Sequence, residues 1–121
     1  MKKKILVIDD SETIRTQVGQ LLRIAGYEVL EAPDGIIGAF TIRERNDLSL
    51  VICDVNMPRM DGLEMLDVLR GQTENLPILM LTTEARLDKM DRAKRAGAKA
   101  WIIKPFKPEL LVAAVAKLVG T

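Results

Sequence analysis

The sequence predicts an α/β protein built on an open, doubly wound sheet of five parallel strands, with the unit (βα) repeated five times. Five short apolar runs recur along its 121 residues, and most are rich in Ile, Val or Leu without alternation. Such runs are typical of strands that are covered on both faces. Helix-length segments separate them, which favours right-handed crossovers. A closed barrel needs about eight such units and roughly 250 residues, so an open sheet is predicted.

The predicted strands span residues 5–8, 27–30, 48–53, 78–81 and 101–103. Capping signals mark the first two helices. Ser11 precedes a helix whose apolar residues repeat from Ile14 at i, i+4, i+7, i+8 and i+11, and Gly26 follows it. Asp34 precedes a second helix, and a third begins after Asp61 and Gly62. The apolar residues of these two helices are Ile36, Ile37 and Phe40, then Leu63, Leu66 and Leu69.

The last two helices follow from similar signals. The fourth is predicted over residues 85–96, with Leu87, Met90 and Ala93 facing inward and Gly97 after its end. The fifth follows Pro108, and its apolar stripe comprises Leu110, Leu111, Ala114, Val115 and Leu118. No linker interrupts this pattern. We therefore expect one domain over residues 1–121, without an output domain.

Composition excludes several classes of function. The chain has no histidine, which rules out Ser-His-Asp catalysis, His-ligated zinc and phosphohistidine. Cys53 is the only cysteine and has no partner for an internal disulfide, so we expect a reducing, cytoplasmic setting. The longest stretch without charge, residues 75–83, has nine residues, whereas a membrane span needs about twenty. A membrane protein is therefore not expected.

Charge is distributed unevenly. Residues 86–107 carry eight basic and two acidic side chains, a balance of +6, and the remainder carries ten basic and fifteen acidic side chains, a balance of −5. The basic segment is either a solvated helix face or a surface for an acidic partner. Nucleic acid is not expected, because no helix-turn-helix remains after the five units are assigned and aromatic residues make up 3% of the chain.

Polar residues follow four of the five predicted strands. They are Asp9 and Asp10, then Asp54, then Thr82 and Thr83, then Lys104. Each residue alone has an ordinary explanation: an Asp after a strand caps the next helix, a Thr forms a turn, and a Lys makes the end of the strand soluble. A parallel sheet, however, brings these ends to one edge, where ligands bind. Three carboxylates there repel one another, so either their pKa values rise or a cation binds, and an all-oxygen cluster suits Mg²⁺ more than Zn²⁺.

This set of side chains favours phosphoryl transfer to an aspartate. An aspartate is ionised at neutral pH and attacks phosphorus without a general base, while lysine and threonine stabilise the transferred oxygens. Neither GxxxxGK[ST] nor GxGxxG occurs, so nucleotide sites are not expected. A phosphatase of the haloacid dehalogenase type needs a second Asp two residues after the nucleophile, where this chain has Asn56.

Four motifs at these spacings resemble one family. They are ILVIDD (5–10), DVNMPRMDG (54–62), LTT (81–83) and KPF (104–106). Over essentially its whole length the chain is similar to the receiver domains of bacterial response regulators, and most of all to stand-alone, CheY-like receivers of the chemotaxis type. The resemblance implies a flavodoxin-like fold with strand order 2-1-3-4-5 and a cis peptide bond between Lys104 and Pro105.

The resemblance also implies roles for individual residues. Asp54 would accept the phosphoryl group, Lys104 would contact it, and Thr82 and Trp101 would act as switch residues. The expected Mg²⁺ ligands are Asp9, Asp10, Asp54 and the main-chain carbonyl of Asn56, with Asp9 acting largely through a bound water. Asn56 and Glu84 match positions that tune dephosphorylation. The chain would be a signalling protein that catalyses only its own phosphorylation and dephosphorylation.

The partners implied are a histidine kinase as phosphodonor, a possible phosphatase and a downstream target such as a flagellar switch component. The usual output surface comprises the fourth helix, fifth strand and fifth helix, and we expect contacts from Lys89, Arg92, Lys99, Trp101 and Lys107. A monomer is expected.

Two other functions stay open. One is a phosphate shuttle to a histidine phosphotransfer protein, and the other is an interaction module that has lost phosphorylation. The complete set Asp9, Asp10, Asp54, Thr82 and Lys104 argues against the second.

Overall fold

The computed structural model describes residues 2–120 and confirms the predicted fold class. Within this range five strands and five helices alternate, and the strands pair in parallel in the order β2-β1-β3-β4-β5. The strands are β1 (Lys4–Ile8), β2 (Glu28–Ala32), β3 (Leu48–Cys53), β4 (Ile78–Thr82) and β5 (Ala100–Ile103). The helices are α1 (Glu12–Ile24), α2 (Gly35–Glu44), α3 (Gly62–Val68), α4 (Leu87–Arg95) and α5 (Pro108–Val119). No helix among the described residues is long and apolar enough to cross a membrane.

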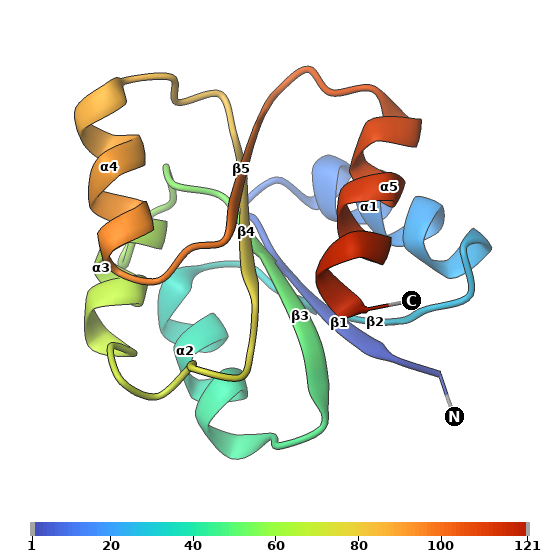
Figure 1. Ribbon diagram of the computed structural model, residues 1–121, viewed down its shortest axis with the longest axis horizontal. Helices are drawn as coiled ribbons and strands as arrows, with labels where there is room; N and C mark the ends of the chain where they lie inside the picture. Colours follow the sequence, from blue (N-terminus) through green and yellow to red (C-terminus); the bar gives the residue numbers. More distant parts are fainter. Residues whose placement is uncertain (1, 121) are drawn as a thin grey trace.

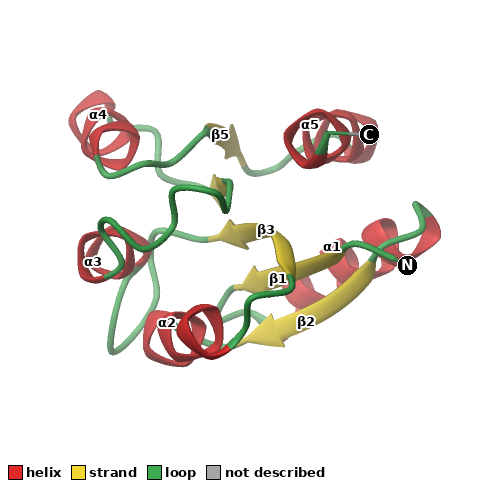
Figure 2. Ribbon diagram, turned by 60° about the horizontal axis from the view of Figure 1, so that its bottom comes forward, coloured by secondary structure: helices red, strands yellow, loops and turns green. Residues whose placement is uncertain are grey.

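The helices cover both faces of the sheet (Figure 1). Figure 2 shows α2, α3 and α4 on one face and α1 and α5 on the other. Successive residues of a strand point to opposite faces, so Leu6 and Ile8 belong to the core beneath α2 to α4, and Ile5 and Val7 to the core beneath α1 and α5. Both faces are apolar, which explains why the strand sequences do not alternate.

The bounds of several elements differ from the prediction by one or two residues, and β2 and α4 differ at both ends. The second strand begins one residue later and runs through Glu31 to Ala32, because it pairs with β1 along its whole length, from Lys4↔Glu28 to Ile8↔Ala32. The prediction missed this extension because the charged residue Glu31 interrupts the apolar run. The fourth helix begins at Leu87 rather than at residue 85, since Arg86 is extended (φ −72°, ψ 130°) and is the N-cap of the helix. The N–H groups of Ala85 and Arg86 donate to the side chain of Glu84.

Some apolar residues predicted to mark helix faces are exposed. Leu87 was expected to face inward and is 77% exposed. In α2 the three apolar residues named in the prediction, Ile36, Ile37 and Phe40, are exposed, and the helix instead buries Gly35, Gly38, Ala39 and Ile42. A Cβ on Gly38 would lie 2.5 Å from Cδ1 of Ile8. The helix therefore lies so close to β1 that small residues must form the contact.

Gly62 sets the distance between α3 and the end of β3. Its N–H donates to the carbonyl of Val55 (2.8 Å), and Asp61 caps the helix in a reciprocal capping box with Glu64. A Cβ on Gly62 would overlap the carbonyl oxygen of Asp54 and lie 2.9 Å from the methyl group of Met80. Only glycine allows the helix to begin this close to the strand.

We therefore expect Gly62→Ala to lower the free energy of unfolding by about 1–3 kcal/mol, because backbone must move to admit the methyl group. Gly19→Ala is the matched control. Gly19 lies inside α1, where the nearest obstacle is the flexible end of Arg23, and alanine is expected to stabilise this helix by about 0.5–1 kcal/mol. Urea unfolding measures both variants. Equal effects of the two substitutions would contradict the close approach at Gly62.

Candidate functional site

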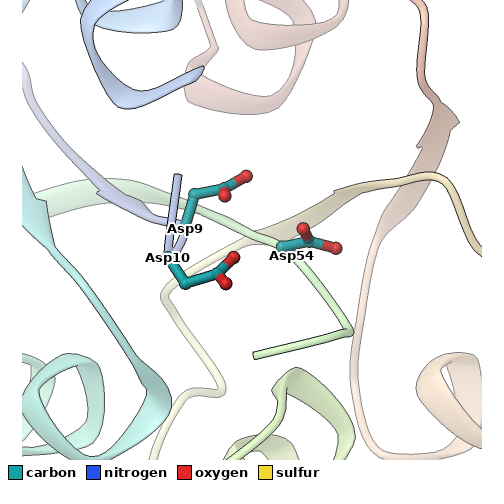
Figure 3. A group of neighbouring side chains, drawn as sticks. All are labelled: Asp9, Asp10 and Asp54. Carbon is teal, nitrogen blue, oxygen red and sulfur yellow. The ribbon is translucent and has the colours of Figure 1, made fainter. Parts of the chain in front are cut away.

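Three carboxylates meet at the carboxyl edge of the sheet (Figure 3). Asp9 and Asp10 follow β1 and Asp54 follows β3, and these two strands are neighbours. One carboxylate oxygen from each of the three lies within 4.8 Å of the others. Asp9 is 3% and Asp54 is 8% exposed, whereas Asp10 faces solvent. The structure thus brings together the acidic residues that the sequence predicted to meet.

Lys104 joins two of these carboxylates. Its Nζ lies 2.7 Å from Oδ2 of Asp9 and 3.1 Å from Oδ2 of Asp54. Its backbone N–H donates to the carbonyl of Thr82 (2.8 Å), and the following bond to Pro105 is cis, as the resemblance implied. The ammonium group therefore lies between both buried carboxylates, and it is itself largely shielded from solvent.

Backbone N–H groups hold the other oxygens of the same carboxylates. Oδ1 of Asp9 accepts from the N–H of Ser11 (2.9 Å), and Oδ1 of Asp54 accepts from the N–H groups of Val55 (2.6 Å) and Asn56 (3.3 Å). Each buried carboxylate is thus anchored through Oδ1 and turns Oδ2 toward Lys104. Two anchored oxygens per group leave these side chains little freedom to rotate.

The site contains more negative charge than one ammonium group balances. Burial raises the pKa of Asp9 above its ordinary value, although Lys104 and the N–H of Ser11 act in the opposite direction. Burial also lowers the pKa of Lys104, but contacts with Asp9 and Asp54 outweigh it, so the pKa of Lys104 is raised. Carboxylate oxygens without His or Cys are the ligands that hard cations such as Mg²⁺ prefer. This donor set therefore fits a divalent cation.

The two predicted switch residues are linked through Glu84. The buried hydroxyl of Thr82 accepts from the N–H of Glu84 (3.2 Å), and the indole N–H of Trp101 donates to the carbonyl of Glu84 (3.0 Å). The carboxylate of Glu84 pairs with Lys89 at 2.9 Å, and this contact is the main reason why the pKa of Glu84 is lowered. The Glu84 side chain thus faces α4 in this structure. Trp101 is half-buried beside it.

The residues predicted for partner binding lie on α4, on β5 and just before and after β5. Lys99 and Lys107 are exposed near the two ends of β5, whereas Arg92 reaches α3 and pairs with Asp67 at 2.6 Å. A groove of about 590 Å³ lies between α4 and β5, and its lining includes Leu87, Lys99 and Trp101. Arg92 lies three residues after Lys89 on α4 and does not line this groove.

Asp34 and Arg59 form a contact that the sequence did not reveal. Arg59 lies in the loop that carries Asn56, and it adopts a left-handed conformation (φ 66°) that a side chain of its type rarely adopts. Its guanidinium donates to Oδ2 of Asp34, with Nε at 2.9 Å and Nη2 at 2.8 Å. The N–H of Gly35 donates to the carbonyl of Met60 (3.1 Å). The start of α2 therefore holds this loop at two adjacent residues.

A family model for the response regulator receiver domain matches residues 5–116. The chain belongs to the response regulator receiver family. The chemotaxis protein CheY homolog of Campylobacter jejuni is 36% identical, over 98% of this chain and 93% of that protein. The chemotaxis protein CheY1 of Helicobacter pylori is 36% identical over 98% of both chains. The chemotaxis response regulators are thus among the relatives of this receiver domain.

Solved structures agree with this assignment. The receiver domain is similar to the chemotaxis protein CheY4 of Vibrio cholerae, with 39% identity, a TM-score of 0.88 and coverage of 98% and 99% of the two chains. A CheY-like receiver domain protein of Methanospirillum hungatei is 30% identical, with a TM-score of 0.93 and coverage of 99% and 95%. The predicted family and the strand order are both confirmed.

We expect the charge of Asp34 to make the stability of the receiver domain depend on pH. The N–H of Ile37, and then Arg59, bind its buried carboxylate and lower its pKa from the ordinary value of 3.8. A carboxyl group with a lowered pKa stabilises the fold above its unfolded-state pKa, and this contribution is lost as the pH falls through its folded-state pKa. Asn keeps the cap but lacks the charge. We therefore expect Asp34→Asn to lower the free energy of unfolding by about 1 kcal/mol at pH 7.

We expect the difference in free energy of unfolding between the wild type and Asp34→Asn to become smaller below pH 4. Urea unfolding from pH 7 to pH 2 measures this difference. Asp88→Asn, at an exposed position, is the control and is expected to follow the wild type. A gap that stays constant over the whole pH range would mean that the charge of Asp34 does not contribute to stability.

Proposed function

We propose that this receiver domain accepts a phosphoryl group on Asp54 from a histidine kinase, in a Mg²⁺-dependent reaction. The observation that supports it most is the position of Lys104, whose Nζ lies between Oδ2 of Asp9 and Oδ2 of Asp54. An aspartate anchored through one oxygen, beside a cation and two further carboxylates, is the arrangement that phosphoryl transfer needs.

The reaction forms one bond and breaks one. A carboxylate oxygen of Asp54 attacks the phosphorus of a phosphohistidine, the new O–P bond forms as the N–P bond breaks, and the released imidazole takes a proton from solvent. Oδ1 of Asp54 is bound by two backbone N–H groups, so Oδ2, which faces Lys104, is the nucleophile. Lys104 then stabilises the charge on the transferred oxygens.

Magnesium would be held by Asp9, Asp10, Asp54 and the main-chain carbonyl of Asn56, and when bound it would offset the charge of the carboxylates and the phosphoryl group. The chain supplies the rest. Its part is to hold the nucleophile, place the ammonium group of Lys104 and keep the carboxylates close together. We propose that the chain is a signalling protein that catalyses only its own phosphorylation and dephosphorylation.

The signal would leave through α4, β5 and α5. Thr82 senses the phosphoryl group, and its hydrogen bond with Glu84 connects it to Trp101, which lines the groove beside α4. The proposed contacts are Lys89, Arg92, Lys99, Trp101 and Lys107, and the ion pair that Arg92 forms with Asp67 is exposed. Asn56 and Glu84 would tune the lifetime of the phosphoryl group. The chemotaxis relatives favour a flagellar switch component as target and a cytoplasmic setting.

Acetyl phosphate tests the acceptor directly. We expect the intact mass to rise by one phosphoryl group in the presence of Mg²⁺, and to stay unchanged with EDTA. Asp54→Asn removes the nucleophile and is expected to show no gain. Asp61→Asn is the matched control, since it changes a carboxylate of the same loop and is expected to be phosphorylated like the wild type.

The outcomes separate the possible functions. A gain of mass in Asp54→Asn would place the acceptor elsewhere, and no gain in the folded wild type would favour a non-phosphorylated interaction module. With the acceptor established, preferred transfer to a histidine phosphotransfer protein rather than binding to a flagellar target would make the domain a shuttle.

Charge reversal tests the output surface. We expect the pair Lys99→Glu and Lys107→Glu to weaken binding of the phosphorylated chain to an acidic flagellar switch segment by about tenfold, because opposite charges across an interface become like charges. Fluorescence anisotropy measures the affinity. Arg70→Glu, an exposed arginine after α3, is the control and is expected to bind like the wild type. Unchanged affinity of the double variant for every target tested would exclude this surface.

A further inference from the structure

Arg15 contacts the acidic site through the main chain of Asp9, whereas Lys104 contacts the side chain. It lies in the first turns of α1, and its side chain is only 16% exposed. Nη1 donates to the main-chain carbonyl of Asp9 at 2.6 Å. This carbonyl belongs to the peptide bond between Asp9 and Asp10, two of the three carboxylates in the cluster. Neither the motifs nor the strand-end pattern in the sequence indicated this contact.

Glu31 holds the guanidinium in place. Its Oε1 accepts from Nε of Arg15 at 3.1 Å, while its other oxygen, Oε2, lies 3.8 Å from Arg23 of the same helix. Glu31 pairs with Val7 in the sheet, so it lies beside the end of β1. A planar guanidinium bound through two different nitrogens has a defined direction, which a single contact would not provide.

We propose that Arg15 is a positioning residue for the cation site: it fixes the peptide between Asp9 and Asp10 and thereby the direction of both carboxylates. This inference rests on the proposed function. The N–H of Asp9 already donates to the carbonyl of Ala32 (3.1 Å), and its side chain is bound by Ser11 and Lys104. The carbonyl is the remaining polar group of this residue, and Arg15 binds it. Asp10 follows directly, so the same peptide plane directs its carboxylate.

Three possible roles of Arg15 predict different effects of its removal on Mg²⁺ affinity: a decrease, no change or an increase. A positioning residue, when removed, weakens binding, because the carboxylates lose their common direction. A residue that only stabilises the fold leaves the affinity of the folded protein unchanged. A residue that acts only as a counter-charge tightens binding when it is removed, since a cation near the incoming cation has gone.

The test is titration calorimetry of the unphosphorylated chain with Mg²⁺ alone. For Arg15→Gln we expect a Kd about tenfold higher than that of the wild type, the lower end of what loss of a group that orients metal ligands costs. Arg15→Lys keeps one donor, and we expect its Kd to lie between those of the wild type and Arg15→Gln. Arg23→Gln removes a positive charge from the same helix without touching Asp9, and is expected to bind like the wild type.

Thermal unfolding in EDTA reports the structural contribution separately. If Arg15→Gln does not fold, Glu31→Gln serves instead, because it leaves Arg15 in place but weakens the contact that directs it, and its Kd is expected to rise several-fold. The proposal would be overturned if the folded variants had an unchanged or a lower Kd for Mg²⁺. The proposed function would still stand in that case, provided that the wild type binds Mg²⁺ and is phosphorylated. A wild type that binds no Mg²⁺ would overturn the proposed function itself.

Discussion

The site depends on the contacts that the ammonium group of Lys104 makes with Asp9 and Asp54. Two carboxylates that are almost wholly buried would destabilise the fold through desolvation and mutual repulsion unless a cation lay between them. Lys104 comes from the end of β5, whereas Asp54 follows β3, with β4 between them. Neighbouring strands are about 4.8 Å apart, so the gap is about 10 Å and needs a long side chain. The strand order and this lysine are therefore linked.

The backbone around the site is adapted to close approach. Gly62 lets α3 begin against the carbonyl of Asp54, and Gly35 lets α2 touch the carbonyl of Met60. The loop between β3 and α3 is thus held from both sides, with Arg59 in a left-handed conformation as part of its attachment to Asp34. Strained conformations of this kind persist where surrounding contacts enforce them, and they are common at functional sites.

Local signals in the sequence predicted much of the molecule. The caps Ser11 and Asp34 were each recognised beside the helix that they begin, because a cap depends only on residues three or four positions away. The third helix was predicted to begin after Gly62, and the structure shows that it begins at Gly62 with Asp61 as its cap. The polar residues at strand ends were recognised because the carboxyl ends of parallel strands always meet at one edge. The position of Arg15 could not be inferred in this way, since its contacts lie six and sixteen residues away on other elements.

The sequence by itself determined the fold class, the family and the set of side chains at the carboxyl edge of the sheet, since periodicity, caps and motif spacing are properties of neighbouring residues. Only the tertiary structure decided which oxygens face Lys104, that Arg92 of α4 pairs with Asp67 of α3, and that α2 packs through Gly38 while Phe40 is 62% exposed. Contacts between elements depend on how closely the elements approach one another, and that distance is set by the packing of the whole chain.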